Sequence, residues 1–127
     1  MPPLRCRPST AKKVVIFIVV FTHAANGTAQ QFANSAWELA LGCNPETMPE
    51  LAQACTGYMS AIAAVIIESR RMYKLPECIP KQLTWGQVVT PIPKYLREHR
   101  EFWGYTAQDG ILEGLRGIYK CSFPPQP

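Results

Sequence analysis

Acidic side chains are missing from the first 37 residues of this 127-residue chain, and the first acid is Glu38. Four basic residues stand within the first 13 positions: Arg5, Arg7, Lys12 and Lys13. The chain has 13 Lys and Arg against 9 Asp and Glu, so without these four it has 13 − 4 = 9 basic residues against 9 acidic ones. The balanced remainder lacks the basic surface by which proteins bind nucleic acids, and we expect no nucleic-acid partner.

Long apolar runs are also scarce. The stretch Val14 to Phe21 has eight residues, whereas a helix that crosses a membrane needs about 20. Hydrophobic residues make up 47% of the chain and charged residues 17%, which excludes an intrinsically disordered polyelectrolyte. The length suits one domain and is too short for two of ordinary size. We therefore expect one folded soluble domain.

The N-terminal segment has the order of a secretory signal peptide: basic residues, then the apolar run, then small residues. The small residues are Ala24, Ala25, Gly27 and Ala29. Gly27 and Ala29 suit the two positions that a signal peptidase inspects, so we expect cleavage after Ala29, with Ala25 as the second choice. An uncleaved signal anchor is the alternative. The predicted parts are a signal peptide, residues 1–29, and an exported domain, residues 30–127, with no stable membrane insertion after cleavage.

The cysteine pattern fits an oxidising compartment. Cys6 lies in the predicted leader, which leaves Cys43, Cys55, Cys78 and Cys121 in the exported domain. Four cysteines in a small exported domain indicate two disulfides. A zinc site is the alternative, but no pair has the spacing of two to four residues that structural zinc ligands usually show.

Apolar periodicity predicts two helices in the first half of the exported domain. The first covers residues 31–41 and ends at Gly42. The second, the central helix, covers residues 50–74 and would be about 37 Å long. Its ends carry the charges that a helix dipole favours, with Glu50 at the start and Arg70, Arg71 and Lys74 at the finish.

Prolines and a capping motif define the third helix. Pro76 and Pro80 stop the central helix, and the sequence from Thr84 to Gln87 matches a capping box, so a new helix begins there. Pro91 and Pro93 interrupt it and predict either a kink or a restart with Thr90 as the cap. A fourth helix is expected from about Arg100 to Tyr119.

Small residues suggest where two helices approach each other. Gly57, Ala61 and Ala64 form a stripe on the central helix, and Gly110 and Gly114 form another on the fourth. Each glycine costs about 1 kcal/mol inside a helix, and close contact between these two helices would explain the choice. A frayed or partly irregular fourth helix is the alternative.

These elements predict an all-α fold, a small up-and-down bundle of about four helices. In that arrangement Cys43 lies just before the central helix and reaches only Cys55, while the fourth helix ends beside Cys78 at Cys121. We therefore expect the disulfides Cys43–Cys55 and Cys78–Cys121. The loop-entropy relation gives these bridges about 3 and about 4 kcal/mol of stability.

Catalytic groups are few. After residue 29 the chain has one histidine, His99, and bridged cysteines leave no thiol to pair with it. His99 lies in a charged turn, and no glycine-rich phosphate loop follows a strand. We expect a protein that is not an enzyme, has no catalytic residue, holds no metal or cofactor, and works by binding.

Exposed aromatic and charged side chains on loops are the best candidates for a binding surface. One such segment contains Glu98, His99, Arg100, Glu101, Phe102 and Trp103. The other runs from Glu77 to Trp85 and is stiffened by Cys78 and two prolines. The alternative for both is that Trp85 and Trp103 simply cap the core.

An ordered set of motifs runs along the exported domain: Leu41, Cys43, Cys55-Thr56-Gly57-Tyr58, Cys78-Ile79-Pro80, Gln87, Tyr95-Leu96-Arg97, Ala107, Leu115 and Cys121. In this order and spacing the chain resembles the Rap/Tai immunity proteins of type VI secretion systems. The resemblance implies a periplasmic, all-helical protein with intramolecular disulfides, commonly a homodimer. It further implies that the protein neutralises a peptidoglycan amidase effector by blocking its active-site cleft.

Several positions depart from the family pattern. Ala61 and Ala64 stand where an acid and a second glycine often occur, Arg100 stands where a proline is common, and Lys120 replaces the proline before the last cysteine. These departures leave the partner open, and an orphan member with another protein partner is one alternative. Another is an exported carrier of a small apolar ligand, with an interior between Tyr58, Ile62, Val65 and Ile111.

Overall fold

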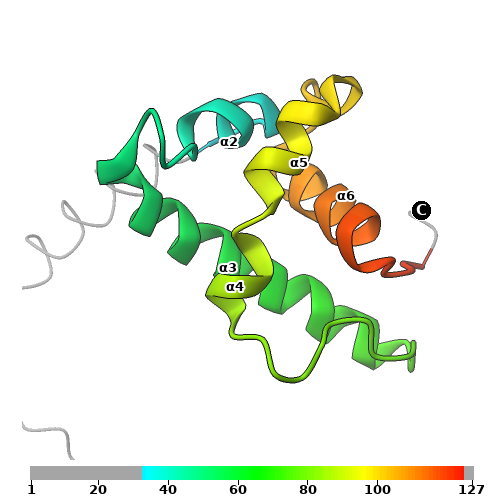
Figure 1. Cartoon of the computed structure of the whole chain (residues 1–127). Helices are drawn as coiled ribbons and strands as arrows, with labels where there is room; N and C mark the ends of the chain where they lie inside the picture. The colour runs from blue at the N-terminus through cyan, green and yellow to red at the C-terminus, as the bar shows by residue number, and fades with distance from the viewer. Residues whose placement is uncertain (1–32, 125–127) are drawn as a thin grey trace, which may run out of the picture. The chain divides into compact units, whose positions relative to one another are not determined.

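The computed structural model describes residues 33–124, and these residues form helices and connecting turns without a named strand (Figure 1). The elements are α2 (Ala36–Gly42), α3 (Pro49–Met72), α4 (Trp85–Val89), α5 (Ile92–Glu98), the 3-10 helix η1 (Arg100–Phe102) and α6 (Ala107–Tyr119). The prediction of a small all-α fold with two disulfides is confirmed. The predicted signal peptide, residues 1–29, lies outside the described residues.

Helix α2 begins later than the sequence pattern predicts. Ser35 accepts a hydrogen bond from the Glu38 amide, and the Glu38 carboxylate accepts one from the Ser35 amide, so the two residues form a capping box. This pair fixes the first turn at Ala36. The predicted start at residue 31 is therefore wrong for residues 33–35, because apolar periodicity alone does not show where a cap interrupts it.

The central helix α3 is confirmed within two residues at each end. It buries one face, formed by Cys55, Met59, Ala63, Ile67 and Arg70. Pro49 occupies its first turn, where a missing amide hydrogen costs nothing. Lys74, just past its end, adopts a left-handed conformation with φ 55°.

Helix α3 also has an apolar outer face. By length and composition alone it could cross a membrane, although polar residues interrupt its apolar sequence. Its buried face, however, packs into the core, and Cys55 bonds to Cys43. One face of α3 therefore belongs to the core, while much of its apolar surface is exposed.

The predicted third helix is two short helices. Thr84 and Gln87 form the predicted capping box at the start of α4. The helix restarts between the two prolines, with Pro93 in the first turn of α5, and the expected cap is wrong because Thr90 does not cap α5. Its hydroxyl instead donates to the Gly86 carbonyl at 2.6 Å, and Pro91 precedes the first residue of α5.

The fourth helix begins later than the predicted start at about Arg100. Residues 100–102 form η1, and α6 begins only at Ala107, where the Thr106 hydroxyl accepts from the Asp109 amide at 3.1 Å. Ser35 and Thr106 also pair in an isolated antiparallel bridge. The turn before α6 is thereby attached to the start of α2.

The glycines of α6 do allow close packing, but the predicted partner is wrong. A Cβ atom at Gly110 would lie 2.6 Å from that of Ala36, on α2, and one at Gly114 would lie 3.0 Å from Ile92, on α5. A Cβ at Gly57 on α3 would meet nothing within 4 Å. The glycines of α6 therefore pack closely on α2 and α5, whereas Gly57 and Ala61 of α3 are exposed.

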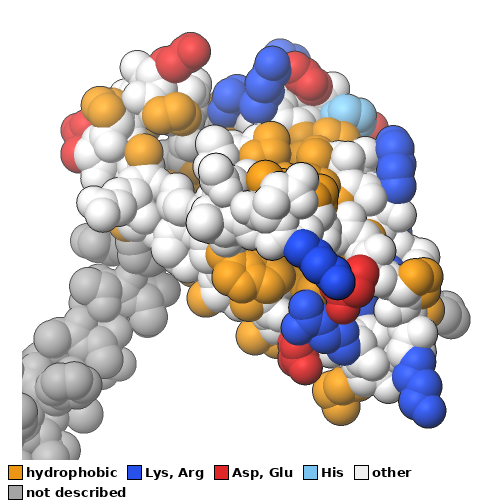
Figure 2. Space-filling view, turned by 60° about the horizontal axis from the view of Figure 1, so that its bottom comes forward, with side chains coloured by type: hydrophobic (Ala, Val, Ile, Leu, Met, Phe, Trp, Pro, Cys, Tyr) orange, Lys and Arg blue, Asp and Glu red, His pale blue; other side chains and the backbone are white. Residues whose placement is uncertain are grey.

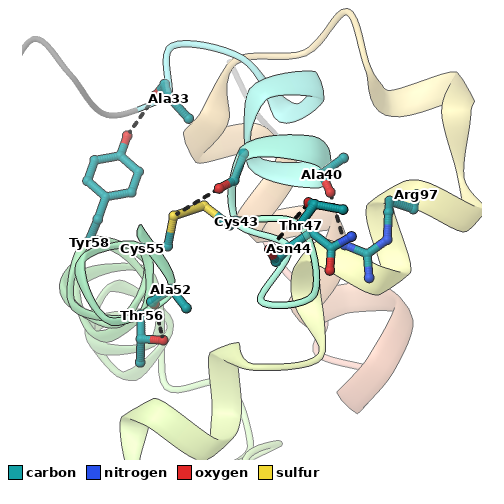
Figure 3. The surroundings of a disulfide bond; sticks show 11 residues. Ala33, Ala40, Cys43, Asn44, Thr47, Ala52, Cys55, Thr56, Tyr58 and Arg97 are labelled. Carbon is teal, nitrogen blue, oxygen red and sulfur yellow. Dashed lines mark hydrogen bonds between the residues drawn. A yellow bond between two sulfur atoms is a disulfide. The ribbon is translucent and has the colours of Figure 1, made fainter. Parts of the chain in front are cut away.

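Both predicted disulfides are present. Cys43–Cys55 joins the end of α2 to α3 with a Cα–Cα distance of 5.6 Å, and Cys78–Cys121 joins the loop after α3 to the end of α6 with 5.2 Å. Figure 3 shows the first bridge and, beyond Asn44, the Arg97 guanidinium, which donates to the Ala40 carbonyl at 3.0 Å. The bridge and this hydrogen bond link α2 to both α3 and α5.

A buried arginine holds the C-terminal segment. Arg70 is 2% exposed, and its Nε donates to the Ser122 carbonyl at 2.6 Å. The centre of the Phe123 ring lies 5.6 Å from the guanidinium carbon of Arg70 and 5.7 Å from that of Arg116. These contacts keep the residues after Cys121 against the helices.

Candidate functional site

The turn between α5 and α6, residues 98–103, contains all the predicted binding residues except Trp85. Its main chain is held by successive short-range hydrogen bonds. The Phe102 amide donates to the His99 carbonyl at 3.1 Å, the Trp103 amide to the Arg100 carbonyl at 3.1 Å, and the Tyr105 amide to the Phe102 carbonyl at 2.9 Å. The turn therefore has a defined backbone rather than an open loop.

Trp103 fastens this turn to the core. Its indole nitrogen donates to the carbonyl of the fully buried Leu96 at 2.7 Å. The Arg100 guanidinium lies 5.2 Å from the centre of the Trp103 ring, a cation–π geometry. Trp103 is half-buried, so the ring both supports the turn and remains partly available to a partner.

A row of aromatic rings runs across the end of α5 and the turn. The rings of Tyr95 and His99 stack with centroids 4.0 Å apart, those of His99 and Phe102 are 6.1 Å apart, and those of Phe102 and Tyr105 are 5.4 Å apart. His99 Nδ1 lies 2.8 Å from the Tyr95 carbonyl oxygen. These contacts hold the His99 ring in the row, so the ring has a structural role.

Burial raises the pKa of Tyr95, and the carboxylates of Glu113 and Glu101 raise it further, while the Arg116 guanidinium lowers it. The phenol therefore stays neutral at physiological pH. A neutral, half-buried ring can contribute apolar contact area without the cost of desolvating a charge.

Charged side chains surround this row. Glu98, Arg100 and Glu101 are exposed, so both signs of charge lie beside half-buried aromatic rings. Protein interfaces commonly have this arrangement, in which aromatic and arginine anchors supply the energy and a polar rim excludes water.

Trp85 belongs to a second surface. It is 37% exposed and lines a groove of about 400 Å³ between α3, α4 and the Cys78 loop. Besides Trp85 the lining residues are Ile67, Arg71, Glu77, Ile79, Pro80, Lys81, Leu83 and Val88. Figure 2, in which the bottom of Figure 1 is turned forward, shows hydrophobic side chains next to a cluster of basic and acidic ones.

One wall of the groove is fixed by an ion pair. Arg71 Nε lies 2.9 Å from a Glu77 oxygen, and Arg71 NH1 lies 3.0 Å from a Glu68 oxygen. The hydrogen bond from Arg71 lowers the pKa of Glu77. The pair holds the loop after α3 against the helix surface.

The structure thus brings together the six predicted residues of the turn but does not join Trp85 to them. Among the described residues, no hydrogen bond or ring contact links Trp85 with residues 98–103. Helix α4 precedes α5 and the turn follows it, so the two surfaces lie at opposite ends of α5 (Figure 1).

Sequence reasoning missed Tyr95 and Tyr105, which extend the aromatic row on both sides. The spacing of residues 95, 99 and 102 on one helical face could have revealed the first part of the row. Tyr105 lies in an irregular turn, where no periodicity places its ring beside Phe102.

The described residues offer little for catalysis. Their four cysteines are bonded in pairs, and no group of three or more histidine, cysteine, aspartate or glutamate side chains among residues 33–124 is arranged to hold a metal ion. With two bridges and a rigid turn, the arrangement is suited to binding.

The sequence matches the family of Rap1a immunity proteins over residues 28–121, most of the chain. The chain belongs to this family. The resemblance stated from the motifs is therefore confirmed. Comparison with curated proteins and with solved structures gave no match.

Membership of the Rap1a immunity proteins makes this a non-enzymatic protein that binds a toxin effector. The two disulfides agree with a location outside the cytoplasm. The alternative of an apolar carrier does not fit, because Val65 is 71% exposed while Ile111 is buried. These two residues therefore do not enclose one cavity.

Proposed function

We propose that this Rap1a immunity protein protects the cell that makes it by binding a peptidoglycan amidase effector of the type VI secretion system. In this proposal the turn at residues 98–103 enters the active-site cleft of the amidase and excludes the peptidoglycan. The observation that carries it is the anchored turn, in which Trp103 bonds to the core and the aromatic row supports the backbone.

Rigidity is what a blocking turn requires. A segment already ordered before binding loses less conformational entropy when it docks. The turn is ordered by main-chain hydrogen bonds, by the Trp103 indole and by ring stacking. Its exposed Arg100 and Glu101 can then provide charged contacts at the rim of the cleft.

The proposed site of action is the periplasm. We propose that residues 1–29 act as a signal peptide, since they have the basic, apolar and small-residue order of one. Amidase effectors act on the cell wall, so an inhibitor must reach the same compartment. The disulfides support this location, because reducing conditions in the cytoplasm would oppose them.

A homodimer is also part of the proposal. Two copies would allow the groove beside Trp85 of one protomer to contact the amidase that is held by the turn of the other. That role would explain why the two candidate surfaces lie apart on one chain.

A calorimetric titration against the amidase encoded next to this gene tests the proposal. The Arg100→Glu variant should weaken binding at least tenfold, because an arginine beside an aromatic ring is a typical energetic centre of an interface. Gln53→Glu introduces a carboxylate at an exposed site on α3 and should leave the affinity unchanged. Peptidoglycan hydrolysis and survival of cells with periplasmic amidase provide parallel readouts.

Two results would overturn the proposal in different ways. Absence of binding and of rescue by the native protein would exclude this amidase as the partner and indicate an orphan with another ligand. Tight inhibition that Arg100→Glu leaves intact would keep the amidase but move the contact to another surface, for which Trp85→Ala is the next variant.

A further inference from the structure

Helix α6 carries a glycine, Gly117, that lies against Tyr95, the first ring of the aromatic row. Gly117 stands two residues before the end of the helix, where glycine is disfavoured relative to alanine unless packing requires it. A Cβ atom at this position would lie 2.5 Å from Tyr95 Cε2 and closer still to Cζ and the hydroxyl oxygen. The Tyr95 ring therefore occupies the space that any side chain at residue 117 would need.

Gly117 differs from the two glycines that precede it on α6. Gly110 and Gly114 face fully buried side chains of α2 and α5, so these two glycines serve the packing of the core. Gly117 and Tyr95 are both half-buried, at the edge of the core. The absence of a side chain at residue 117 therefore concerns a ring near the surface and not the centre of the fold.

The Tyr95 ring is in turn stacked with the next two rings of the row. Its centroid lies 4.0 Å from that of His99 and 6.3 Å from that of Phe102, and the two ring planes are inclined to it by 19° and 17°. The His99 and Phe102 rings are inclined to each other by 16°. These separations and small angles are those of stacked aromatic pairs. The three rings form one stack, so a displaced Tyr95 ring displaces His99 and Phe102 as well.

We infer that Gly117 is a positioning residue for the binding turn: it leaves the space in which the Tyr95 ring lies, and that ring sets the places of His99 and Phe102. This role rests on the proposed function of residues 98–103. Gly117 lies outside the turn, on α6, and acts on a partner only through the Tyr95 ring. Because an ordered segment loses less conformational entropy when it docks, a disturbed row weakens binding.

The surroundings of Gly117 determine what a larger side chain there would move. The three atoms nearest to an added Cβ all belong to the end of the Tyr95 side chain. At Gly110, by contrast, the Ala36 backbone lies 3.2 Å from the added atom. A side chain can rotate about its own bonds, whereas two packed helices must separate as units. Gly117→Ala should therefore displace the ring and leave the fold intact.

NMR of the free protein tests the effect on the row. The material is the protein purified from the periplasm of cells that express the full chain. The Tyr95 ring current shifts the ring protons of His99, because the two rings are stacked. At a fixed pH these shifts should move toward those of an isolated histidine in Gly117→Ala. Gly57→Ala, whose added Cβ meets nothing within 4 Å, should leave them unchanged.

Unchanged His99 shifts in Gly117→Ala would overturn the inference, because the row would then not depend on Gly117. Circular dichroism of the same sample shows whether the helices are retained. Unfolding of Gly117→Ala would overturn it too, since the glycine would then serve the fold as a whole.

Calorimetric titration against the amidase encoded next to this gene tests the effect on binding. Gly117→Ala should weaken the affinity about tenfold, because the turn is no longer held in its binding conformation. Tyr95→Ala should weaken it as well. In the Tyr95→Ala background the added methyl group meets no phenol ring, so Gly117→Ala should change the affinity by less than about twofold. A loss that stays near tenfold in that background would overturn the inference, because Gly117 would then act by another route.

Failure of this inference and failure of the proposed function are distinguishable. A native protein that does not bind the amidase would overturn the proposed function and the binding part of the inference, while the His99 shifts of the free protein still decide whether Gly117 positions the row. Equal affinity of the native protein and Gly117→Ala would overturn the inference alone and leave the proposed function in place.

Discussion

At the scale of single residues, Trp103 makes two interactions, a hydrogen bond and a cation–π contact, that a substitution can separate. The indole N–H bonds to the Leu96 carbonyl, and the ring carries the Arg100 guanidinium. Trp103→Phe keeps an aromatic ring and removes the donor, so we expect a loss of about 1 kcal/mol in the free energy of unfolding. Urea denaturation measures this loss.

Trp85→Phe is the matched control for this substitution. The Trp85 indole has no hydrogen bond among the described residues and is partly exposed, so the free energy of unfolding should change by less than about 0.5 kcal/mol. Equal losses for the two variants would mean that the indole hydrogen bond does not hold the turn.

The Arg71–Glu77 pair makes a prediction about pH. Because Arg71 lowers the pKa of Glu77, the stabilisation is present above the pKa that Glu77 has in the unfolded chain and is lost as pH falls through the lower, folded value. An NMR titration should therefore give Glu77 a higher pKa in Arg71→Gln than in the native protein. The same pKa in both would show that solvent screens the pair completely.

Candidate binding residues could be predicted from the sequence where side chains suited to binding lie together in one short segment. The turn from Glu98 to Trp103 was predicted as a unit, because aromatic and charged residues adjoin there. The part played by Tyr105 could not be predicted, since its ring meets Phe102 only after η1 and the following turn reverse the chain.

At the scale of helices, glycine positions give a direct test of packing. Gly110→Ala would place a Cβ atom 2.6 Å from that of Ala36, and the backbone of Ala36 lies 3.2 Å away. Helices α2 and α6 would have to separate, so we expect a loss of about 1–3 kcal/mol in the free energy of unfolding.

Gly57→Ala provides the comparison, because the added Cβ meets nothing within 4 Å inside α3. Alanine is favoured over glycine in a helix by up to about 1 kcal/mol, so this variant should be more stable than the native protein. Chemical denaturation of both variants checks the pair. A stabilising Gly110→Ala would show that α6 does not approach α2 closely.

Helix existence was predictable, while helix limits and partners were less so. The 24 residues of α3 are long and apolar enough to be predicted as a helix, and the Thr84–Gln87 capping box is visible in the sequence. The partner of Gly110 was mistaken, because a stripe of small residues permits close approach without specifying which helix approaches. Only the direction of the buried face of α3 decides this.

At the scale of the whole molecule, the two disulfides connect the helices into one covalent framework. Cys43–Cys55 closes 12 residues and Cys78–Cys121 closes 43. Loop entropy therefore predicts losses of about 3 kcal/mol for Cys43→Ala with Cys55→Ala and about 4 kcal/mol for Cys78→Ala with Cys121→Ala. Guanidinium denaturation of the two double variants measures both.

The second loss is a large part of the stability expected for a domain of this size, about 5–15 kcal/mol. The native protein with a reducing agent should behave like a chain that lacks both bridges. A domain that keeps its full stability under reduction would contradict the framework role, whatever its partner.

The position of Cys121 has a consequence for biosynthesis. In a chain that leaves the cytoplasm N-terminus first, Cys55 can join Cys43 early, but Cys78 must wait until almost the last residues emerge. A product that ends before Cys121 keeps the Cys78 thiol unpaired and has a C-terminal segment that no disulfide holds. Proteases cleave such segments readily. Formation of the second disulfide therefore requires a chain that is complete as far as Cys121.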